Sequence, residues 1–247
     1  MSARGAGLAL ALVGSLALVP SAVAQRIVLG RSVEQRPIVA YRLGDPHGHP
    51  VLIVGCVHGN ERAGIAVVRL LRRLPVPARV DLWLVPVANP DGAAYNQRTN
   101  AHDVDLNRQF PDGWKRILAG TPSGPRPLSE PESRVIHRLL LRLRPEISIW
   151  YHQHLALVDE SGGSRPVELR YARLVGLPLH RLRRLPGSIT TWTNHALGGS
   201  AFVVELPAGA LTPRSAQRHA AAVRELAGAL SEGGLAPRSR LLPAPPW

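Results

Sequence analysis

Apolar runs alternate with segments of helical period along most of the chain. Residues 51–57 are almost continuously apolar, as is typical of a strand that is buried on both faces of a sheet. Residues 61–74 carry aliphatic side chains on one helical face and arginines elsewhere, which predicts a helix that ends at Pro75. A buried strand followed by an amphipathic helix is the repeating unit of α/β proteins.

The remaining patterns complete this picture. Ser129 and Glu132 have the spacing of a capping box, which predicts the start of a helix that continues to about Leu143. A last helix is predicted from about Thr212 to Leu230. Further strands are predicted over residues 37–43, 80–87, 147–151 and 200–204. We therefore predict a single α/β domain with a mixed, largely buried β-sheet that is flanked by helices on both faces.

The two ends of the chain differ from the predicted domain at residues 25–234. Residues 1–24 contain an apolar run and then Ala22-Val23-Ala24, which predicts a signal peptide and export to the periplasm or the outside of the cell. The run is shorter than the roughly 20 residues that cross a bilayer, so an uncleaved anchor is the second interpretation. No other long apolar segment predicts a transmembrane domain in the mature chain. Residues 235–247 are a Pro-rich tail.

Composition narrows the class of protein. The 247 residues are 45% hydrophobic, and their formal net charge is +13. All but one of the 30 basic residues are arginines, and they are spread thinly without a basic block, so we do not expect a nucleic-acid partner. The basic surface is instead expected to attract acidic substrates or an anionic cell wall. With Cys56 as the single cysteine, no internal disulfide can form.

Metal-ligating residues follow two of the predicted strands. His58 and Glu61 come directly after the run at residues 51–57, and His152 closes the run at residues 147–151. Histidine and glutamate are ordinary zinc ligands, and the carboxyl ends of parallel strands meet at one edge of a sheet. Three protein ligands leave a fourth position for water, as in catalytic zinc sites. Glu205 follows the last predicted strand and is the candidate general base.

The ordered motifs resemble a known family over residues 45–230. They are His58-Gly-Asn-Glu61, Asn89-Pro-Asp-Gly92, Arg98, Asp105-Leu-Asn-Arg108-Gln-Phe-Pro111, Ser129-Glu-Pro-Glu132, His152 and Phe202-Val-Val-Glu205. In this order and spacing the chain resembles the zinc metallocarboxypeptidase superfamily of carboxypeptidase A. Within that superfamily it is most similar to the bacterial murein-tripeptide amidases.

The resemblance implies a role for each matched residue. His58, Glu61 and His152 would bind one zinc ion per chain, and Glu205 would be the general base. Arg98 would stabilise the oxyanion that forms from the scissile carbonyl. The substrate's terminal carboxylate would bind to two further residues, Asn107 and Arg108.

Three features leave alternatives open. His154 lies two positions after His152, so it could be the ligand instead, a supporting residue or a pocket wall. No tyrosine lies between Tyr171 and Glu205, where carboxypeptidases of this type usually carry an active-site tyrosine. Residues 187–200 are rich in small polar side chains and are either a polar pocket wall or a surface loop.

These observations predict an exported zinc peptidase. Its substrate would be a peptide with a free C-terminal carboxylate, such as a murein peptide with a γ-D-glutamyl-diaminopimelate bond. Two alternatives are an N-acyl amino acid deacylase, similar to the aspartoacylases and succinylglutamate desuccinylases, and an inactive cell-wall-binding relative. The second would require loss of a ligand or of the base, and the chain retains both.

Overall fold

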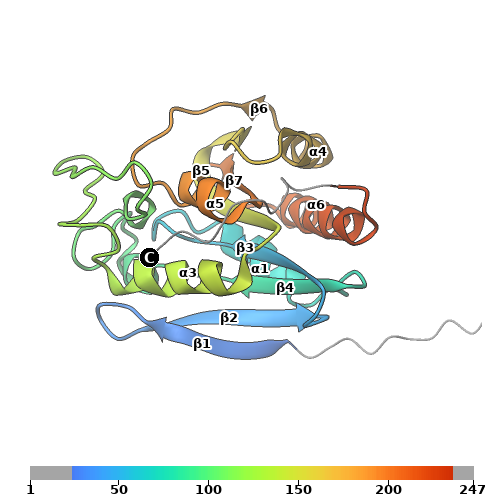
Figure 1. The fold of residues 1–247 in the computed structure, drawn as a ribbon, viewed down its shortest axis with the longest axis horizontal. Helices are drawn as coiled ribbons and strands as arrows, with labels where there is room; N and C mark the ends of the chain where they lie inside the picture. Colours follow the sequence, from blue (N-terminus) through green and yellow to red (C-terminus); the bar gives the residue numbers. More distant parts are fainter. Residues whose placement is uncertain (1–23, 236–247) are drawn as a thin grey trace, which may run out of the picture.

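A mixed seven-stranded sheet with helices on both faces forms the centre of the computed structural model, which describes residues 24–235 (Figure 1). The predicted leader and tail lie outside these residues, except for Ala24 and Leu235. The strands are β1 (Gln25–Arg31), β2 (Pro37–Gly44), β3 (His49–Val54), β4 (Val80–Val85), β5 (Ile147–Asp159), β6 (Leu179–His180) and β7 (Ser200–Pro207). The helices are α1 (Gly64–Leu71), α2 (Pro90–Tyr95), α3 (Pro131–Leu143), α4 (Arg165–Val175), α5 (Ile189–Leu197) and α6 (Pro213–Ser231), with a short 3-10 turn, η1, at Leu106–Arg108.

The strand order brings the candidate ligands to one edge of the sheet. The order is β1-β2-β4-β3-β5-β6, and β7 pairs with β5. β2 is antiparallel to β1 and β4, whereas β3 is parallel to β4 and β5, and β5 is parallel to β7. The carboxyl ends of β3, β5 and β7 therefore lie together. The predicted mixed α/β sheet is confirmed.

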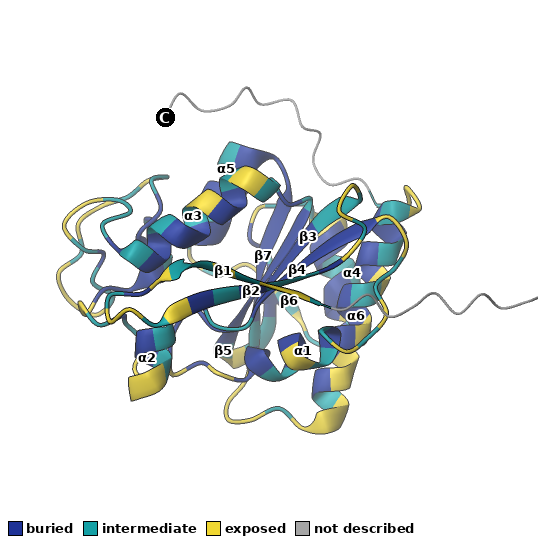
Figure 2. Cartoon of the chain, turned by 90° about the horizontal axis from the view of Figure 1, so that it is seen from below, coloured by how far each residue is buried: buried dark blue, intermediate teal, exposed yellow. Residues whose placement is uncertain are grey.

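Two apolar layers hold the sheet between its helices. Alternate residues of β3 point to opposite faces, so Val51 and Ile53 join the core under α1, α4 and α6, while Leu52 and Val54 join the core under α3 and α5. Figure 2 shows α3 and α5 on one side of the sheet and α1 and α6 on the other, with the central strands buried. Burial on both faces explains the continuous apolar runs of these strands.

The helix predicted over residues 61–74 is shorter than expected. α1 begins only at Gly64, so Glu61 lies in the loop before it. The Ala63 amide donates to the Gln153 side chain (2.9 Å), and a Cβ on Gly64 would lie 2.4 Å from the Gly55 carbonyl oxygen. The close approach at Gly64 needs glycine. Together the two contacts hold the ligand loop, residues 58–63, against β5.

The strand predicted over residues 147–151 is longer than expected, so His152 lies within β5 and not after it. The extension pairs with β7, and His152 is the register partner of Glu205. The register then reverses, because Leu157 pairs with Glu205 and Val158 pairs with Val204. The end of β5 thus runs back alongside β7.

The predicted capping box is wrong. Glu130 is the N-cap residue of α3, and no side chain caps this helix. The Ser129 hydroxyl contacts the side-chain oxygen of Gln109 (3.2 Å), and Glu132 accepts the Val33 amide (3.0 Å). Both side chains are thus used by tertiary partners that the local sequence does not indicate.

Two further elements differ from the expectations. The turn predicted at residues 89–92 is the start of α2, and the Asn89 side chain accepts the Gly92 amide there (2.9 Å). α4, which the sequence patterns did not predict, buries Val167 and Tyr171 against the sheet. Within residues 24–235, no helix combines the length and hydropathy needed to span a membrane.

Candidate metal centre

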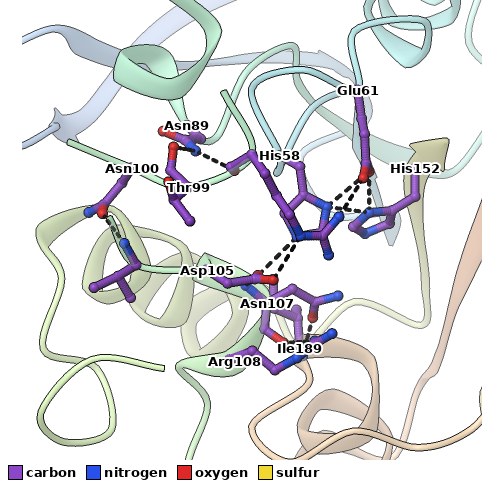
Figure 3. Close-up of polar contacts among 12 residues, drawn as sticks. His58, Glu61, Asn89, Thr99, Asn100, Asp105, Asn107, Arg108, His152 and Ile189 are labelled. Carbon is purple, nitrogen blue, oxygen red and sulfur yellow. Dashed lines mark hydrogen bonds and ion pairs between the residues drawn. The ribbon is translucent and has the colours of Figure 1, made fainter. Parts of the chain in front are cut away.

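Two imidazoles and one carboxylate converge beside the carboxyl end of β3 and the middle of β5. Nδ1 of His58 lies 2.9 Å from Oε2 of Glu61, and Nδ1 of His152 lies 2.8 Å from the same oxygen. The two Nδ1 atoms are 3.0 Å apart. Figure 3 shows these three side chains pointing toward one another, and all three are buried. Across residues 24–235, they are the one group of three or more ligating side chains with this spacing.

Asp105 orients the imidazole of His58 through the ring nitrogen that faces away from the cluster, Nε2. Its Oδ1 lies 2.9 Å from Nε2 of His58, which favours a proton on Nε2 and leaves the Nδ1 lone pair directed at Glu61 and His152. Lone pairs that face one point repel one another unless a proton or a cation lies among them. Imidazole nitrogen and carboxylate oxygen are ordinary zinc ligands, so this donor set fits zinc.

The electrostatics of the cluster also favour a positive charge among its ligands. Burial alone would lower the pKa of His58, but the carboxylates of Asp105 and Glu61 outweigh it and raise the pKa. Burial would raise the pKa of Glu61, but the imidazoles of His152 and His58 outweigh it and lower the pKa below its usual range. The buried carboxylates therefore remain charged and hold either a proton or a cation in the cluster.

Two contacts position Arg98 beside the cluster: the packing of Gly59 against α2 and the hydrogen bonds of the Asn89 side chain. A Cβ on Gly59 would lie 1.9 Å from the carbonyl carbon of Gly92, so only glycine allows the ligand loop to meet α2. The Asn89 amide donates to the carbonyls of Arg98 (3.3 Å) and Thr99 (3.1 Å). This backbone position directs the Arg98 guanidinium to the cluster, where Nη1 donates to Glu61 (2.8 Å) and Nε donates to Asp105 (3.1 Å).

Asn107 and Arg108 lie in η1, directly after Asp105. The Asn107 side chain accepts the Ile189 amide (2.9 Å), which joins η1 to the start of α5. Arg108 is 5% exposed, and its Nη1 donates to the Asn107 carbonyl (2.5 Å). Its Nε has no hydrogen-bond partner among the described residues, and burial lowers its pKa. This buried cation therefore lacks a carboxylate partner in the described part of the chain.

Glu205 lies beside the ligands on β7. Because it is the register partner of His152 in parallel strands, the two side chains lie on the same face. Its Oε2 is buried and has no hydrogen-bond partner among the described residues. Burial raises the pKa of Glu205, although the imidazole of His152 opposes the effect. A carboxyl group of raised pKa is suited to accept a proton from water.

All seven candidate residues line one open pocket. They are His58, Glu61, Arg98, Asn107, Arg108, His152 and Glu205. His154, by contrast, is exposed, belongs neither to the ligand cluster nor to the pocket lining, and lies directly before the point at which β5 begins to turn back. The structure thus brings together the seven candidates and separates them from His154.

The polar segment at residues 187–200 is largely helix α5, neither a surface loop nor a complete pocket wall. Ser188 and Thr190 line the pocket. Asn194 instead donates to the Ala201 carbonyl (2.9 Å), and His195 contacts Asp112 (2.6 Å). The helix forms because Trp192 and other apolar side chains of this segment are buried against β7, which its polar composition concealed.

Sequence reasoning missed the role of Asp105. Asp105 belongs to the motif at residues 105–111, but no local pattern connects it to a histidine 47 positions earlier in the chain. The available signal was its place two residues before a candidate substrate-binding asparagine. Asp105 is fully buried and contacts both His58 and Arg98. It therefore holds both side chains in place at the cluster.

The fold and the site together define a metallohydrolase of the α/β class. The sequence profile described as zinc carboxypeptidase matches residues 11–159 of this chain. The chain therefore belongs to the zinc carboxypeptidase family, and it is a metallopeptidase. The matched segment contains His58, Glu61 and His152, whereas Glu205 lies beyond it.

The chain is similar to several characterised proteins of this family. It is 28% identical to murein peptide amidase A of Escherichia coli strain K12 over 182 residues, which is 66% of this chain and 74% of the relative. It is 30% identical to murein peptide amidase A of Vibrio campbellii over 186 residues, or 67% and 73% of the two chains.

Solved structures give the same picture of the fold. The murein-tripeptide amidase of Escherichia coli O157 superposes with a TM-score of 0.69 at 25% identity, covering 82% of this chain and 91% of that one. The carboxypeptidase A of Helicoverpa armigera superposes with a TM-score of 0.73 at 18% identity, covering 85% and 70% of the two chains. At that identity the second likeness concerns the fold alone.

Proposed function

We propose that this protein hydrolyses the amide bond between a γ-D-glutamyl residue and a C-terminal diaminopimelate in murein peptides, and that it uses one zinc ion per chain. The similarity to murein peptide amidases supports the substrate class. One observation carries the reaction type: the buried guanidinium of Arg108, whose Nε has no hydrogen-bond partner among the described residues, lines the same pocket as the ligand cluster. A cation there requires a substrate whose free carboxylate lies next to the bond that is cut.

His58, Glu61 and His152 would hold the zinc ion, which when bound supplies a Lewis acid at the scissile carbonyl. Glu205 would accept a proton from the attacking water at its unpartnered Oε2 and later donate it to the leaving amine. The raised pKa of Glu205 supports both steps, because its carboxylate binds a proton more readily than an exposed glutamate does.

Two arginines would have separate tasks in this scheme. Arg98 contacts Glu61 and would stabilise the negative charge that develops on the carbonyl oxygen. Arg108 would bind the terminal carboxylate together with Asn107, whose side chain is already oriented by its bond to the Ile189 amide. The first interaction strengthens during the reaction, whereas the second is present as soon as substrate binds.

We further propose that the protein acts outside the cytoplasm. The pattern of residues 1–24 supports export, and murein peptides are found at the cell envelope. The net charge of +13 is consistent with an anionic substrate that carries several carboxylates.

A substrate comparison tests the proposal. Purified protein, stripped of metal and then supplied with zinc, is offered murein tripeptide, ordinary α-linked peptides and N-acetylaspartate, with Glu205→Gln as the matched variant. We expect zinc-dependent release of diaminopimelate well above release from the α-linked peptides, and a loss of at least ~10²-fold in Glu205→Gln. Faster cleavage of the α-linked peptides would indicate a general carboxypeptidase, and cleavage of N-acetylaspartate alone would indicate a deacylase.

A further inference from the structure

One wall of the pocket is a loop between β6 and α5 that carries two adjacent arginines. Arg183 and Arg184 both line the pocket, together with Leu182 and Leu185 of the same loop. Neither arginine belongs to the motifs that resemble the zinc metallocarboxypeptidases. The loop therefore adds cationic side chains to a pocket that already contains Arg98 and Arg108.

A buried aspartate at the end of β5 holds this loop. Asp159 is 3% exposed and accepts the Leu182 amide (2.8 Å). It also forms an ion pair with Arg184 at 2.5 Å, and Arg184 donates a further bond to the Glu160 carbonyl. The charge of Arg184 is thus neutralised within the protein, and Arg184 serves to fix the loop.

The loop is fixed at its other end beside Arg108. The Phe110 amide donates to the Gly187 carbonyl (3.0 Å). A Cβ on Gly187 would lie 2.3 Å from the Arg108 carbonyl oxygen, and the φ angle of Gly187 is +70°, so this contact needs glycine. Arg183 therefore lies on a stretch that is held on both sides and that borders the Arg108 side of the pocket.

The arginines of the pocket divide into two kinds. Arg98 pairs with Glu61 and Asp105, and Arg184 pairs with Asp159. Neither Arg108 nor Arg183 forms an ion pair with any residue in the described range 24–235, and Arg183 is exposed and also lacks a hydrogen bond there. The pocket thus presents two guanidiniums that form no ion pair within residues 24–235, on the side where the terminal residue of a substrate would bind.

We propose that Arg183 binds a second carboxylate on the side chain of the terminal residue and thereby selects diaminopimelate over lysine. This inference rests on the proposed function, in which Arg108 binds the terminal carboxylate itself. Diaminopimelate carries a carboxylate at the far end of its side chain, and lysine has the same chain without it. A guanidinium binds a carboxylate through two parallel hydrogen bonds, which a flexible side chain at the pocket mouth can form.

The experiment compares two tripeptides that differ only by this carboxylate, L-Ala-γ-D-Glu-meso-diaminopimelate and L-Ala-γ-D-Glu-L-Lys. The native protein should prefer the first, as measured by kcat/KM. Arg183→Gln should lower the ratio of the two kcat/KM values up to about fivefold, mainly through KM, since water screens an exposed ion pair. Arg183→Lys should restore part of the ratio because it keeps the charge without the bidentate geometry.

Arg181→Gln is the matched control. Arg181 is exposed on the same loop and does not line the pocket, so this variant removes the same charge from the same surface. It should leave the substrate ratio unchanged. An equal fall of the ratio in both variants would mean that the general positive field selects the substrate, and would overturn the inference.

Other outcomes separate the inference from the proposed function. If the native protein cleaves both tripeptides equally well, the proposed function stands and the role of Arg183 is refuted. If it cleaves neither, the proposed function fails, and calorimetric titration with free meso-diaminopimelate and with lysine decides the inference. Tighter binding of diaminopimelate that is lost in Arg183→Gln supports the inference, and equal binding of the two amino acids refutes it.

Discussion

Replacement of Asp105 by asparagine is expected to weaken zinc binding without removing any ligand. The substitution keeps the size of the side chain and one oxygen that can accept the Nε2–H of His58, but it removes the negative charge. A charged partner makes the imidazole a stronger ligand and holds its tautomer and ring orientation. The same change frees Arg98, which donates to Asp105 through Nε.

The size of the effect follows from burial and geometry. The bond from His58 to Asp105 is 2.9 Å long, and neither side chain is more than 1% exposed, so solvent does not screen the interaction. Loss of such a supporting carboxylate costs roughly 10- to 100-fold in metal affinity. This corresponds to about 1.4–2.7 kcal/mol of binding free energy.

Zinc affinity is measured by competition with a chromophoric chelator, and the melting temperature of the metal-free protein checks folding. Asp81→Asn is the control, because Asp81 is also a buried carboxylate that pairs with an arginine, Arg42, but it lies near the amino end of β4. We expect its zinc affinity to match that of the native protein. Native affinity in Asp105→Asn would refute the argument, and so would an equal loss in both variants.

Three further outcomes are expected. His152→Ala should lose most of its zinc by elemental analysis, whereas His154→Ala should retain about one ion per chain; the reverse order would make His154 the ligand. Steady-state kinetics should show Arg98→Ala mainly lowering kcat and Arg108→Ala mainly raising KM, and identical profiles would contradict separate roles. Burial raises the pKa of Glu168 to about 7, so its carboxyl group keeps its proton up to a higher pH in the folded chain than in the unfolded chain. The free energy of unfolding should therefore fall as the pH rises from about 4.5 through about 7. Glu168→Gln should remove that loss, worth up to about 3 kcal/mol in urea unfolding at pH 8, and an unchanged pH dependence would contradict the assignment.

Local patterns were sufficient for the elements that are buried in a regular way. β3 and β4 were predicted because strands covered on both faces need continuous apolar runs. α6 was predicted to begin near Thr212, and Thr212 is its N-cap residue, whose side chain accepts the Ser215 amide. These signals lie within one element and do not depend on what packs against it.

Elements whose polar residues have distant partners were not predictable in the same way. Glu132 has the spacing of a helix cap, yet it bonds to Val33, 99 positions earlier in the chain. α5 was not predicted, because its polar residues suggested a pocket wall or a surface loop, and the apolar residues of its buried face are explained only by their packing against β7. A tertiary contact decided each of these outcomes against the local pattern.

For the candidate site, too, some properties follow from the local sequence and others only from tertiary contacts. The sequence by itself determined which side chains are suited to bind metal and carboxylate, because residue type and position after a buried strand are local properties. Only the tertiary structure decided that His58, Glu61 and His152 meet within hydrogen-bond distance, that Asp105 supports them, and that His154 lies outside. The physical reason is that the fold joins residues 47 to 94 positions apart in the chain, and the energy of those contacts depends on the whole fold.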